Sequence, residues 1–444
     1  MRSVLILTYY FPPAGGSAVQ RPLKFVKYLP EFGWRPVVLT ARERDYTLRD
    51  DSLSKEVSSD VPVYRAQAPD PYRFYDRLSQ NTKSADLASL ADTDCPTSGF
   101  KQKLALWVRG AFFIPDARVG WLPYAVKRGM DIIRCEKIQA IFATSPPFTT
   151  AVIGALLSGL TGIPWINDYR DPWSGAYFYI PRPVMSRRIE QHLERWCLRR
   201  AHGVVSINQR LFNHLETLYG ENILRHKKVI IPNGFDPDDF QDVVPICEDR
   251  FTITYTGTQN ARMHAGPLLD AIRILVRDEP EFREQIRVRF IGRIGEDIIP
   301  ILRDDELEDI VHITGQMTRR EALEYMAGAD LLLLLIPDTA GSDLIVTGKL
   351  FEYLYTGRPI LCLSNRGEAA DIIRQTRTGL TVEPKNTESI LTWLIEQLKN
   401  WQAGKVRNQP GQDAKAIEQF NRISQTEKLA ALFNSLSNDS QGFL

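Results

Sequence analysis

Leu331-Leu332-Leu333-Leu334-Leu335-Ile336 is an unbroken apolar run, and a second one follows at Pro359–Leu363. A continuous apolar run, rather than an alternating one, is typical of a strand buried on both faces of a parallel sheet. Between the two runs, Lys349–Leu354 has helical spacing. A helix between two buried strands forms a β-α-β unit, so residues 331–363 predict a doubly wound α/β sheet.

The same alternation of apolar runs and helical spacing covers almost the whole chain of 444 residues. Expected strands fall into two serial sets, at 3–9, 36–40, 140–144, 165–168, 203–207 and 228–231, and at 251–256, 287–291, 310–314, 331–336, 359–363 and 380–382. Two such sets predict two doubly wound, Rossmann-like domains that face each other across a cleft. We place these domains at residues 1–235 and 236–413, because Pro232-Asn233-Gly234 ends the first set.

Composition excludes several classes of protein. With 43% hydrophobic and 25% charged residues, the chain is neither fibrous nor wholly disordered. Its five cysteines are scattered, which argues against a disulfide framework or a zinc site and fits a reducing cytoplasm. No apolar run reaches the roughly 18–20 residues that a membrane-spanning helix needs. These features predict a cytoplasmic protein.

The net charge of +1 conceals two halves of opposite sign. Residues 1–235 contain 32 Lys and Arg against 21 Asp and Glu, whereas the remainder contains 23 against 33. A basic domain attracts anionic surfaces, including the inner face of a plasma membrane, although two differently charged solvated surfaces explain the asymmetry equally well. Residues 79–100 lack periodicity and are expected to form a mobile insertion, and the apolar stretch Leu104–Phe113 either packs on the core or touches a membrane.

Two motifs of the front half follow expected strands. Gly15 and Gly16 lie between a strand and a helix, where glycines let backbone N–H groups approach an anion or simply make a tight turn. Asp168, Arg170 and Asp171 run out of the strand at 165–168, at the edge where doubly wound sheets bind ligands. They either orient a hydroxyl or act as a base, or they form a salt-bridged loop.

Two more motifs lie in the back half. Gly257 and Thr258 follow a strand and precede a helix, and Arg262 comes just after them, in a second anion-binding arrangement. Lys349 and Glu352 lie three residues apart near the start of another helix, after the small polar loop at 341–343. They form an ion pair along the helix, or the lysine neutralises a diphosphate while the glutamate accepts hydrogen bonds from a ribose diol.

In their order along the chain, these motifs resemble the retaining glycosyltransferases of family 4, which have the GT-B fold. The most specific pieces are Tyr9–Gly16, Asp168–Trp173, Ile231–Asp236 and Lys349–Pro359. The resemblance implies that the second domain binds a nucleotide-sugar donor and the first an acceptor. It also implies that residues 414–444 contain a helix that crosses back onto the first domain, and that no metal or other cofactor is needed.

The resemblance also assigns roles to individual residues. Catalytic roles fall to Asp171, Arg262 and Lys349. Donor-binding roles fall to Gly15, Gly16, Gly257, Thr258, Ser342, Asp343 and Glu352, and acceptor-side roles to Asp168 and Arg170. Leu344 replaces the first glutamate of the family's E-x7-E pattern, so Gly341, Ser342 and Asp343 are expected to supply the contacts to the sugar.

The sequence therefore predicts a hexosyltransferase that moves a sugar to a hydroxyl of a glycan or lipid-linked acceptor in bacterial cell-surface or exopolysaccharide synthesis. Two alternatives remain open: a GT-B-fold nucleotide-sugar epimerase, and an inactive nucleotide-sugar-binding or scaffold protein. The missing glutamate at Leu344, and the absence of the family's lysine near His264, keep the second alternative open. Nucleic acid is not an expected partner, because the basic residues form no compact recognition motif.

Overall fold

The computed structural model describes residues 1–46, 48–69, 110–111, 113–175, 182–259, 263, 265–296, 298–302, 306–337, 341–344, 346–364, 366–404 and 411–439. The expected insertion at 79–100, most of the stretch 104–113, Arg262 and His264 lie outside these residues. Contacts divide the chain into two compact units, Met1–Pro232 with Arg422–Leu444 (unit 1) and Asn233–Asn421 (unit 2).

Unit 1 contains a parallel seven-stranded sheet in the order β3-β2-β1-β4-β5-β6-β7. Its strands are β1 (Arg2–Leu7), β2 (Trp34–Ala41), β3 (Val63–Ala66), β4 (Ile138–Ser145), β5 (Trp165–Tyr169), β6 (Gly203–Ser206) and β7 (Lys228–Ile230). Among the described residues, its helices of eight residues or more are α1 (Ser17–Tyr28), α5 (Leu122–Cys135), α6 (Thr149–Thr161), α7 (Val184–Arg200), α8 (Gln209–Tyr219) and α16 (Arg422–Asp439). The central strands β1 and β4 are buried almost throughout, as their apolar runs predict. Strand β5 is equally buried, although it contains Asn167 and Asp168.

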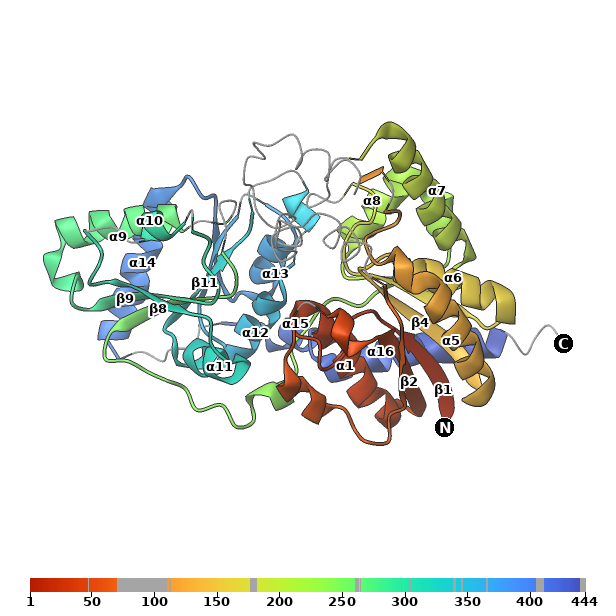
Figure 1. Cartoon of the computed structure of the whole chain (residues 1–444). Helices are drawn as coiled ribbons and strands as arrows, with labels where there is room; N and C mark the ends of the chain where they lie inside the picture. The colour runs from red at the N-terminus through yellow and green to blue at the C-terminus, as the bar shows by residue number, and fades with distance from the viewer. Residues whose placement is uncertain are drawn as a thin grey trace, which may run out of the picture. The chain divides into compact units, whose positions relative to one another are not determined.

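Unit 2 contains a parallel six-stranded sheet in the order β10-β9-β8-β11-β12-β13. Its strands are β8 (Phe251–Thr256), β9 (Ile286–Ile291), β10 (Val311–Gly315), β11 (Leu331–Leu335), β12 (Ile360–Leu363) and β13 (Gly379–Val382). Its helices are α9 (Gly266–Asp278), α10 (Ile299–Leu302), α11 (Arg319–Gly328), α12 (Gly348–Thr356), α13 (Glu368–Thr376), α14 (Thr387–Gln402) and α15 (Ala414–Glu418). The prediction of two doubly wound α/β sheets is confirmed (Figure 1).

The end of the chain returns to unit 1, as expected. Helix α16 packs against α1 and β4, and Figure 1 shows it beside α1. The ring of Phe433, which is fully buried, lies 5.1 Å from that of Trp34 and 6.2 Å from that of Phe142. The Oδ1 of Asn434 accepts a hydrogen bond of 3.1 Å from Trp34 Nε1. The helical region expected within residues 414–444 is divided, because α15 belongs to unit 2 and α16 begins at Arg422.

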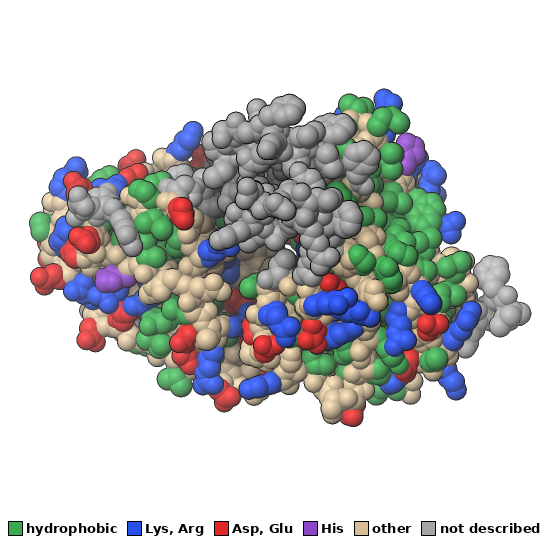
Figure 2. All heavy atoms as spheres, viewed as in Figure 1, with side chains coloured by type: hydrophobic (Ala, Val, Ile, Leu, Met, Phe, Trp, Pro, Cys, Tyr) green, Lys and Arg blue, Asp and Glu red, His purple; other side chains and the backbone are tan. Residues whose placement is uncertain are grey.

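Charge is spread over the surface of unit 1. Figure 2 shows Lys and Arg side chains along this unit on the face that it draws, with Asp and Glu side chains between them. Many exposed basic residues have acidic partners, such as Arg49 with Asp51 and Lys228 with Glu216. Pairs of this kind contribute little to stability, because water screens them.

Replacing Phe433 with Ala should lower the free energy of unfolding by about 3–5 kcal/mol, since it leaves a cavity between α16 and the sheet of unit 1. Urea unfolding followed by tryptophan fluorescence measures this loss. Ser435→Ala on the exposed side of the same helix is the matched control and should change stability by less than about 0.5 kcal/mol. Equal small losses in both variants would show that α16 is not part of the core of unit 1.

Candidate functional site

The described site residues follow strands at the middle of each sheet. In unit 1 the order of strands reverses between β1 and β4, and in unit 2 between β8 and β11. Doubly wound sheets bind ligands at the carboxyl ends of their strands beside such a reversal. Gly15 and Gly16 follow β1, and Gly257 follows β8. Each unit therefore has one edge where its predicted site residues gather.

Asp168 is fully buried at the end of β5 and forms an ion pair with Arg21 of α1. The guanidinium of Arg21 donates two hydrogen bonds to the carboxylate, at 3.0 and 2.8 Å, and Thr144 Oγ1 donates a third at 2.7 Å. Arg21 also donates to the backbone carbonyls of Ile231 and Pro232, at 2.9 and 2.7 Å. Asp168 thus holds α1, β4, β5 and the end of unit 1 together, and its acceptor-side role stays a prediction.

Arg170 joins the predicted glycine turn to the loop after β5. Its guanidinium donates to three backbone carbonyls: Ser145 at 3.0 Å, Ala18 at 2.8 Å and Pro146 at 2.7 Å. Burial lowers the pKa of Arg170, and the nearby carboxylates of Asp168 and Asp171 act in the opposite direction. All three carbonyls belong to the edge where β1, β4 and β5 end, so Arg170 fixes the loops that form this edge.

Asp171 lies one residue further along the loop and is only half-buried. Burial raises the pKa of its carboxyl group, and the positive charge of Arg170 lowers it in part. A carboxylate with a raised pKa is a better proton acceptor than an exposed one, which agrees with the catalytic role that the sequence predicts. That role stays a prediction.

Gly15 and Gly16 form the turn before α1. The φ of Gly16 is +92°, which other residues rarely adopt, and Gly16 is the residue before the first helical turn. A Cβ atom on Gly15 would lie 3.1 Å from Leu48 Cγ, and the backbone N–H of Gly15 donates to Leu48 O at 2.9 Å. The two glycines therefore let the turn lie close to residues 48–50 and leave the start of α1 without a side-chain cap.

In unit 2, Lys349 of α12 lies against the turn that follows β8. Its Nζ donates to Tyr255 Oη at 3.0 Å and lies 4.1 Å from the centre of the Tyr255 ring. A Cβ atom on Gly257, whose φ is +115°, would lie 2.8 Å from Lys349 Nζ. The positive φ favours glycine at position 257, and Lys349 Nζ lies directly against it, so the structure brings these two predicted site residues together.

The environment of Lys349 weakens its charge. Burial lowers the pKa of the ammonium group to about 7, and the carboxylate of Glu352 offsets this shift only in part. The aromatic ring of Tyr255 attracts the ammonium but does not neutralise it. The charged form of such a lysine is strongly stabilised when an anionic ligand binds beside it.

Glu352 lies one turn further along α12 and is bound by a residue that the sequence analysis missed. Its Oε1 lies 2.8 Å from Nη2 of Arg319, which also contacts Asp239 Oδ2 at 2.9 Å. Burial alone would lower the pKa of Arg319, but the two carboxylates raise it above its ordinary value. Arg319 fixes one oxygen of Glu352, so the other oxygen retains lone pairs for further hydrogen bonds.

The remaining described site residues of unit 2 lie in the turns that follow β8 and precede α12. Tyr353 Oη lies 3.1 Å from both the backbone N and Oγ1 of Thr256, which ties α12 to the end of β8. Ser342 and Asp343 begin a single helical turn before α12, and a Cβ atom on Gly367 would lie 2.7 Å from Asp343 Cα. Thr258 is exposed just after Gly257. The turn at 341–344 is therefore packed against the start of α13.

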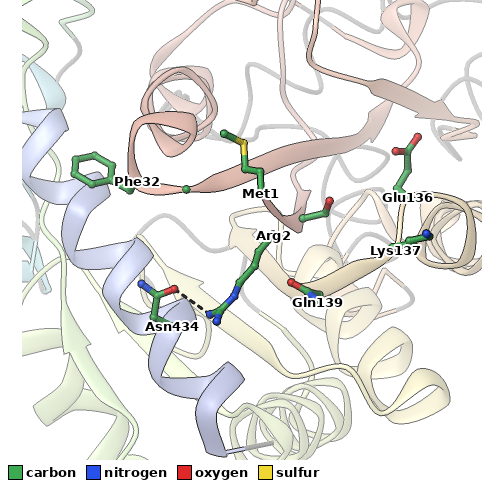
Figure 3. Close-up of a pocket in the computed structure, with 9 residues that line it drawn as sticks. Met1, Arg2, Phe32, Glu136, Lys137, Gln139 and Asn434 are labelled. Carbon is green, nitrogen blue, oxygen red and sulfur yellow. Dashed lines mark hydrogen bonds between the residues drawn. The ribbon is translucent and has the colours of Figure 1, made fainter. Parts of the chain in front are cut away.

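A hollow of about 540 Å³ lies elsewhere in unit 1. It is lined by residues at the amino ends of β1 and β4, among them Arg2, Glu136 and Gln139, and by Asn434 of α16. Figure 3 shows Arg2 pointing toward Asn434, with which it shares a hydrogen bond of 3.3 Å. This hollow lies at the opposite end of β1 from Gly15 and Gly16, roughly 17–20 Å away by the rise of six strand residues. It is not part of the predicted site.

Two family models match the sequence, one for each sheet. The model described as Glycosyltransferase Family 4 matches residues 22–239, and the model described as Glycosyl transferases group 1 matches residues 250–400. The chain belongs to glycosyltransferase family 4. It is therefore a retaining glycosyltransferase that uses a nucleotide-sugar donor, and the resemblance inferred from the motifs is confirmed.

Several solved structures share the fold of this chain. HepE from Anabaena, solved in complex with UDP, is 13% identical with a TM-score of 0.60, and the match covers 98% of this chain and 100% of that one. Sucrose-phosphate synthase from Thermosynechococcus elongatus is 14% identical with a TM-score of 0.62, covering 98% and 99%. A putative UDP-N-acetylglucosamine 2-epimerase from Listeria monocytogenes is 12% identical with a TM-score of 0.55, covering 98% and 97%. These likenesses confirm the GT-B fold; no curated protein matches the sequence.

Membrane-spanning segments are not found among the described residues. No helix in this part of the chain has the length and apolar character needed to cross a bilayer.

Replacing Asp168 with Asn should lower the free energy of unfolding by about 3–5 kcal/mol, because it leaves Arg21 charged and without its ion-pair partner in the interior. The double variant Arg21→Met/Asp168→Leu should be less destabilised than the sum of its single variants, because it removes both charges. Urea unfolding of the unaltered protein, Arg21→Met, Asp168→Leu and the double variant gives this double-mutant cycle. Asp51→Asn, which removes a carboxylate from an exposed ion pair, is the control and should cost less than about 1 kcal/mol. Additive effects in the cycle would contradict a coupled, buried pair.

Proposed function

We propose that the protein transfers a hexose from a nucleoside-diphosphate sugar to a hydroxyl group of a glycan or lipid-linked acceptor, in the synthesis of a bacterial cell-surface polysaccharide or exopolysaccharide. The observation that carries the donor half of this proposal is the placement of Lys349 and Glu352 on one helix, at the carboxyl ends of β8 and β11. UDP is the first nucleotide to test, because the structurally similar HepE binds it.

The start of α12 suits a diphosphate. Its first residues follow Thr347, whose side chain makes no capping hydrogen bond and whose Oγ1 is buried without a partner among the described residues. Uncapped N–H groups and the helix dipole at this end favour a negative charge. Lys349 lies in the same first turn, so the diphosphate would meet both a cation and free backbone donors. Arg262, which follows β8 in the sequence, would add a second cation.

Glu352 suits the ribose of the donor. A carboxylate accepts two hydrogen bonds from a vicinal diol, and Arg319 holds this carboxylate in one orientation. Ser342 and Asp343 would contact the sugar from the turn before α12, in place of the glutamate that Leu344 replaces. Gly15, Gly16, Gly257 and Thr258 would contribute backbone contacts to the donor.

The transfer itself needs charge stabilisation more than a protein nucleophile. The bond between the sugar and the diphosphate breaks, the acceptor oxygen bonds to the same carbon on the same face, and the acceptor proton passes to the departing phosphate. Lys349, Arg262 and the start of α12 would stabilise the charge that grows on the leaving diphosphate. Asp171 would orient the acceptor hydroxyl, within a loop fixed by Asp168 and Arg170.

A thermal-shift panel of UDP-, GDP-, ADP- and dTDP-sugars, repeated on Glu352→Ala, tests the donor site. We expect one nucleotide to raise the melting temperature, and the variant to bind it about 30-fold more weakly, which corresponds to about 2 kcal/mol of charge-assisted hydrogen bonding. Glu396→Ala, on the exposed side of α14, is the matched control and should bind normally. Unchanged binding by Glu352→Ala would remove Glu352 from the donor site. Binding without transfer to any acceptor would favour an inactive binding protein, and a changed sugar without acceptor would favour an epimerase.

Lys349 should couple donor binding to proton uptake. With a pKa of about 7, roughly 90% of the Lys349 side chains are neutral at pH 8 in the free protein, whereas a bound diphosphate stabilises the charged form. Binding should therefore take up close to one proton at pH 8 and almost none at pH 6. Calorimetry in buffers of different ionisation enthalpy measures this uptake, and a nucleotide sugar has no phosphate group that titrates in this range.

The variant Lys349→Met should abolish the proton uptake and weaken binding at pH 6 more than at pH 8. Lys399→Met, at an exposed position on α14, should leave both unchanged. Equal proton uptake by Lys349→Met and the unaltered protein would show that another group titrates.

A further inference from the structure

Helix α7 of unit 1 presents an unusual face to solvent. Three large apolar side chains near its start are mostly exposed: Val184 at 56%, Met185 at 65% and Ile189 at 51%. Exposed arginines lie on the same helix at positions 187, 188, 195, 199 and 200. A helix on the surface of a globular protein normally turns its apolar side chains inward, so this face needs an explanation.

The spacing gathers most of these residues on one side, whereas Val184 and Arg187 lie about 100° and 160° away from Met185. At 100° per residue, Met185, Ile189 and the half-buried Trp196 fall within about 40° of one another. Arg188, Arg195 and Arg199 fall together on one flank of this apolar strip, and Arg200 falls on the other flank. Figure 2 shows hydrophobic and basic side chains next to each other over the region where Figure 1 places α7.

The acidic residues of α7 point inward. Glu190 is 4% exposed, accepts a hydrogen bond of 3.2 Å from Trp173 Nε1 and lies 3.2 Å from Nε of Arg182. Glu194 is fully buried and accepts from the backbone N of Ser174 and from Tyr219 Oη, at 3.1 and 2.6 Å. The exposed charges of α7 are therefore all positive. None of the five exposed arginines has an ion pair within the part of the chain that the structure describes.

The neighbouring helix extends this face. A Cβ atom on Gly159 of α6 would lie 3.1 Å from Nη1 of Arg200, so the end of α6 meets the end of α7. The next residue, Leu160, is 62% exposed. The guanidinium of Arg200 lies 4.9 Å from the centre of the Trp196 ring. Apolar and basic groups thus continue from α7 to the end of α6.

We propose that the exposed face of α7, with Leu160, docks unit 1 on a bilayer that contains anionic phospholipids. The arginines would lie among the headgroups and the apolar side chains would reach the boundary with the acyl chains, as interfacial amphipathic helices do. A nucleic acid would match the charge but would leave Met185 and Ile189 without an apolar partner. The link to a lipid-linked acceptor rests on the proposed function, whereas the docking does not.

This surface differs from the one that the sequence suggested, which was the stretch Leu104–Phe113. Most residues of that stretch lie outside the described part of the chain, and the proposed docking face does not include them. Burial of Glu190 and Glu194 could not be read from the sequence, where the two acids offset part of the charge of α7.

Flotation with vesicles tests the proposal without any sugar nucleotide, so that its failure is distinct from failure of the proposed transferase activity. At low salt the protein should float with vesicles of phosphatidylcholine and phosphatidylglycerol, and not with phosphatidylcholine alone. High salt should weaken the association, because the arginines are screened. The triple variant Arg188→Gln/Arg195→Gln/Arg199→Gln should bind the anionic vesicles roughly 100-fold more weakly, which is about fivefold for each arginine.

The control removes the same charge from other exposed positions of unit 1, in the triple variant Lys55→Gln/Lys127→Gln/Arg134→Gln. It should float almost as well as the unaltered protein. The double variant Met185→Ser/Ile189→Ser should bind the vesicles about tenfold more weakly, because it lacks the apolar contact with the bilayer. Thermal unfolding of each variant checks that it is folded.

Three results would overturn the proposal: no flotation of the unaltered protein at low salt, equal losses in the two triple variants, or no loss in Met185→Ser/Ile189→Ser. The first excludes a bilayer as the partner. The second indicates attraction by net charge without a docking face. The third excludes the apolar contact.

Discussion

The buried ion pair between Arg21 and Asp168 is the constraint on which unit 1 depends. Two charges in the interior are tolerated only when their partners surround them, since each loses its water on burial. Here Thr144 Oγ1 also donates a hydrogen bond to the carboxylate, and the carbonyls of Ile231 and Pro232 accept hydrogen bonds from the guanidinium. The pair therefore requires that α1, β4, β5 and the last residues before unit 2 reach their places together. The loops that carry the predicted acceptor-side residues begin at this point.

The charged residues of the predicted donor site in unit 2 have different surroundings. Lys349 lies over an aromatic ring and beside a glycine, and its charge is only partly balanced by Glu352. Glu352 is held by Arg319, whose second partner is Asp239. Arg21 and Asp168 of unit 1 thus neutralise each other, whereas Lys349 of unit 2 is a cation for which a bound polyanion would relieve the cost of burial. This contrast fits a division between a scaffold for an acceptor and a site for a nucleotide sugar.

The sequence predicted both sheets because buried parallel strands leave a local signal, the unbroken apolar run, as at Leu331–Ile336. The strand Val63–Ala66 was missed because it is short and only partly buried, so its run is not apolar. The turns of Gly257 and of residues 341–343 were predicted from local chemistry. Arg21 and Arg319 were missed, because their partners are 147 and 33 residues away and spacing does not reveal such pairs. An arginine and a lysine on the apolar side of helix 17–28 were the available signal for Arg21.

The return of α16 to unit 1 has a consequence for the order in which the protein is made. Trp34 and Phe142 need Phe433 to cover them, and Phe433 is synthesised after all of unit 2. Unit 2 is one continuous segment, so its core needs no residue from a later part of the chain. Unit 1, although most of it emerges first, keeps an uncovered apolar surface until α16 has been synthesised, which reverses the usual order in which the domains of a chain fold.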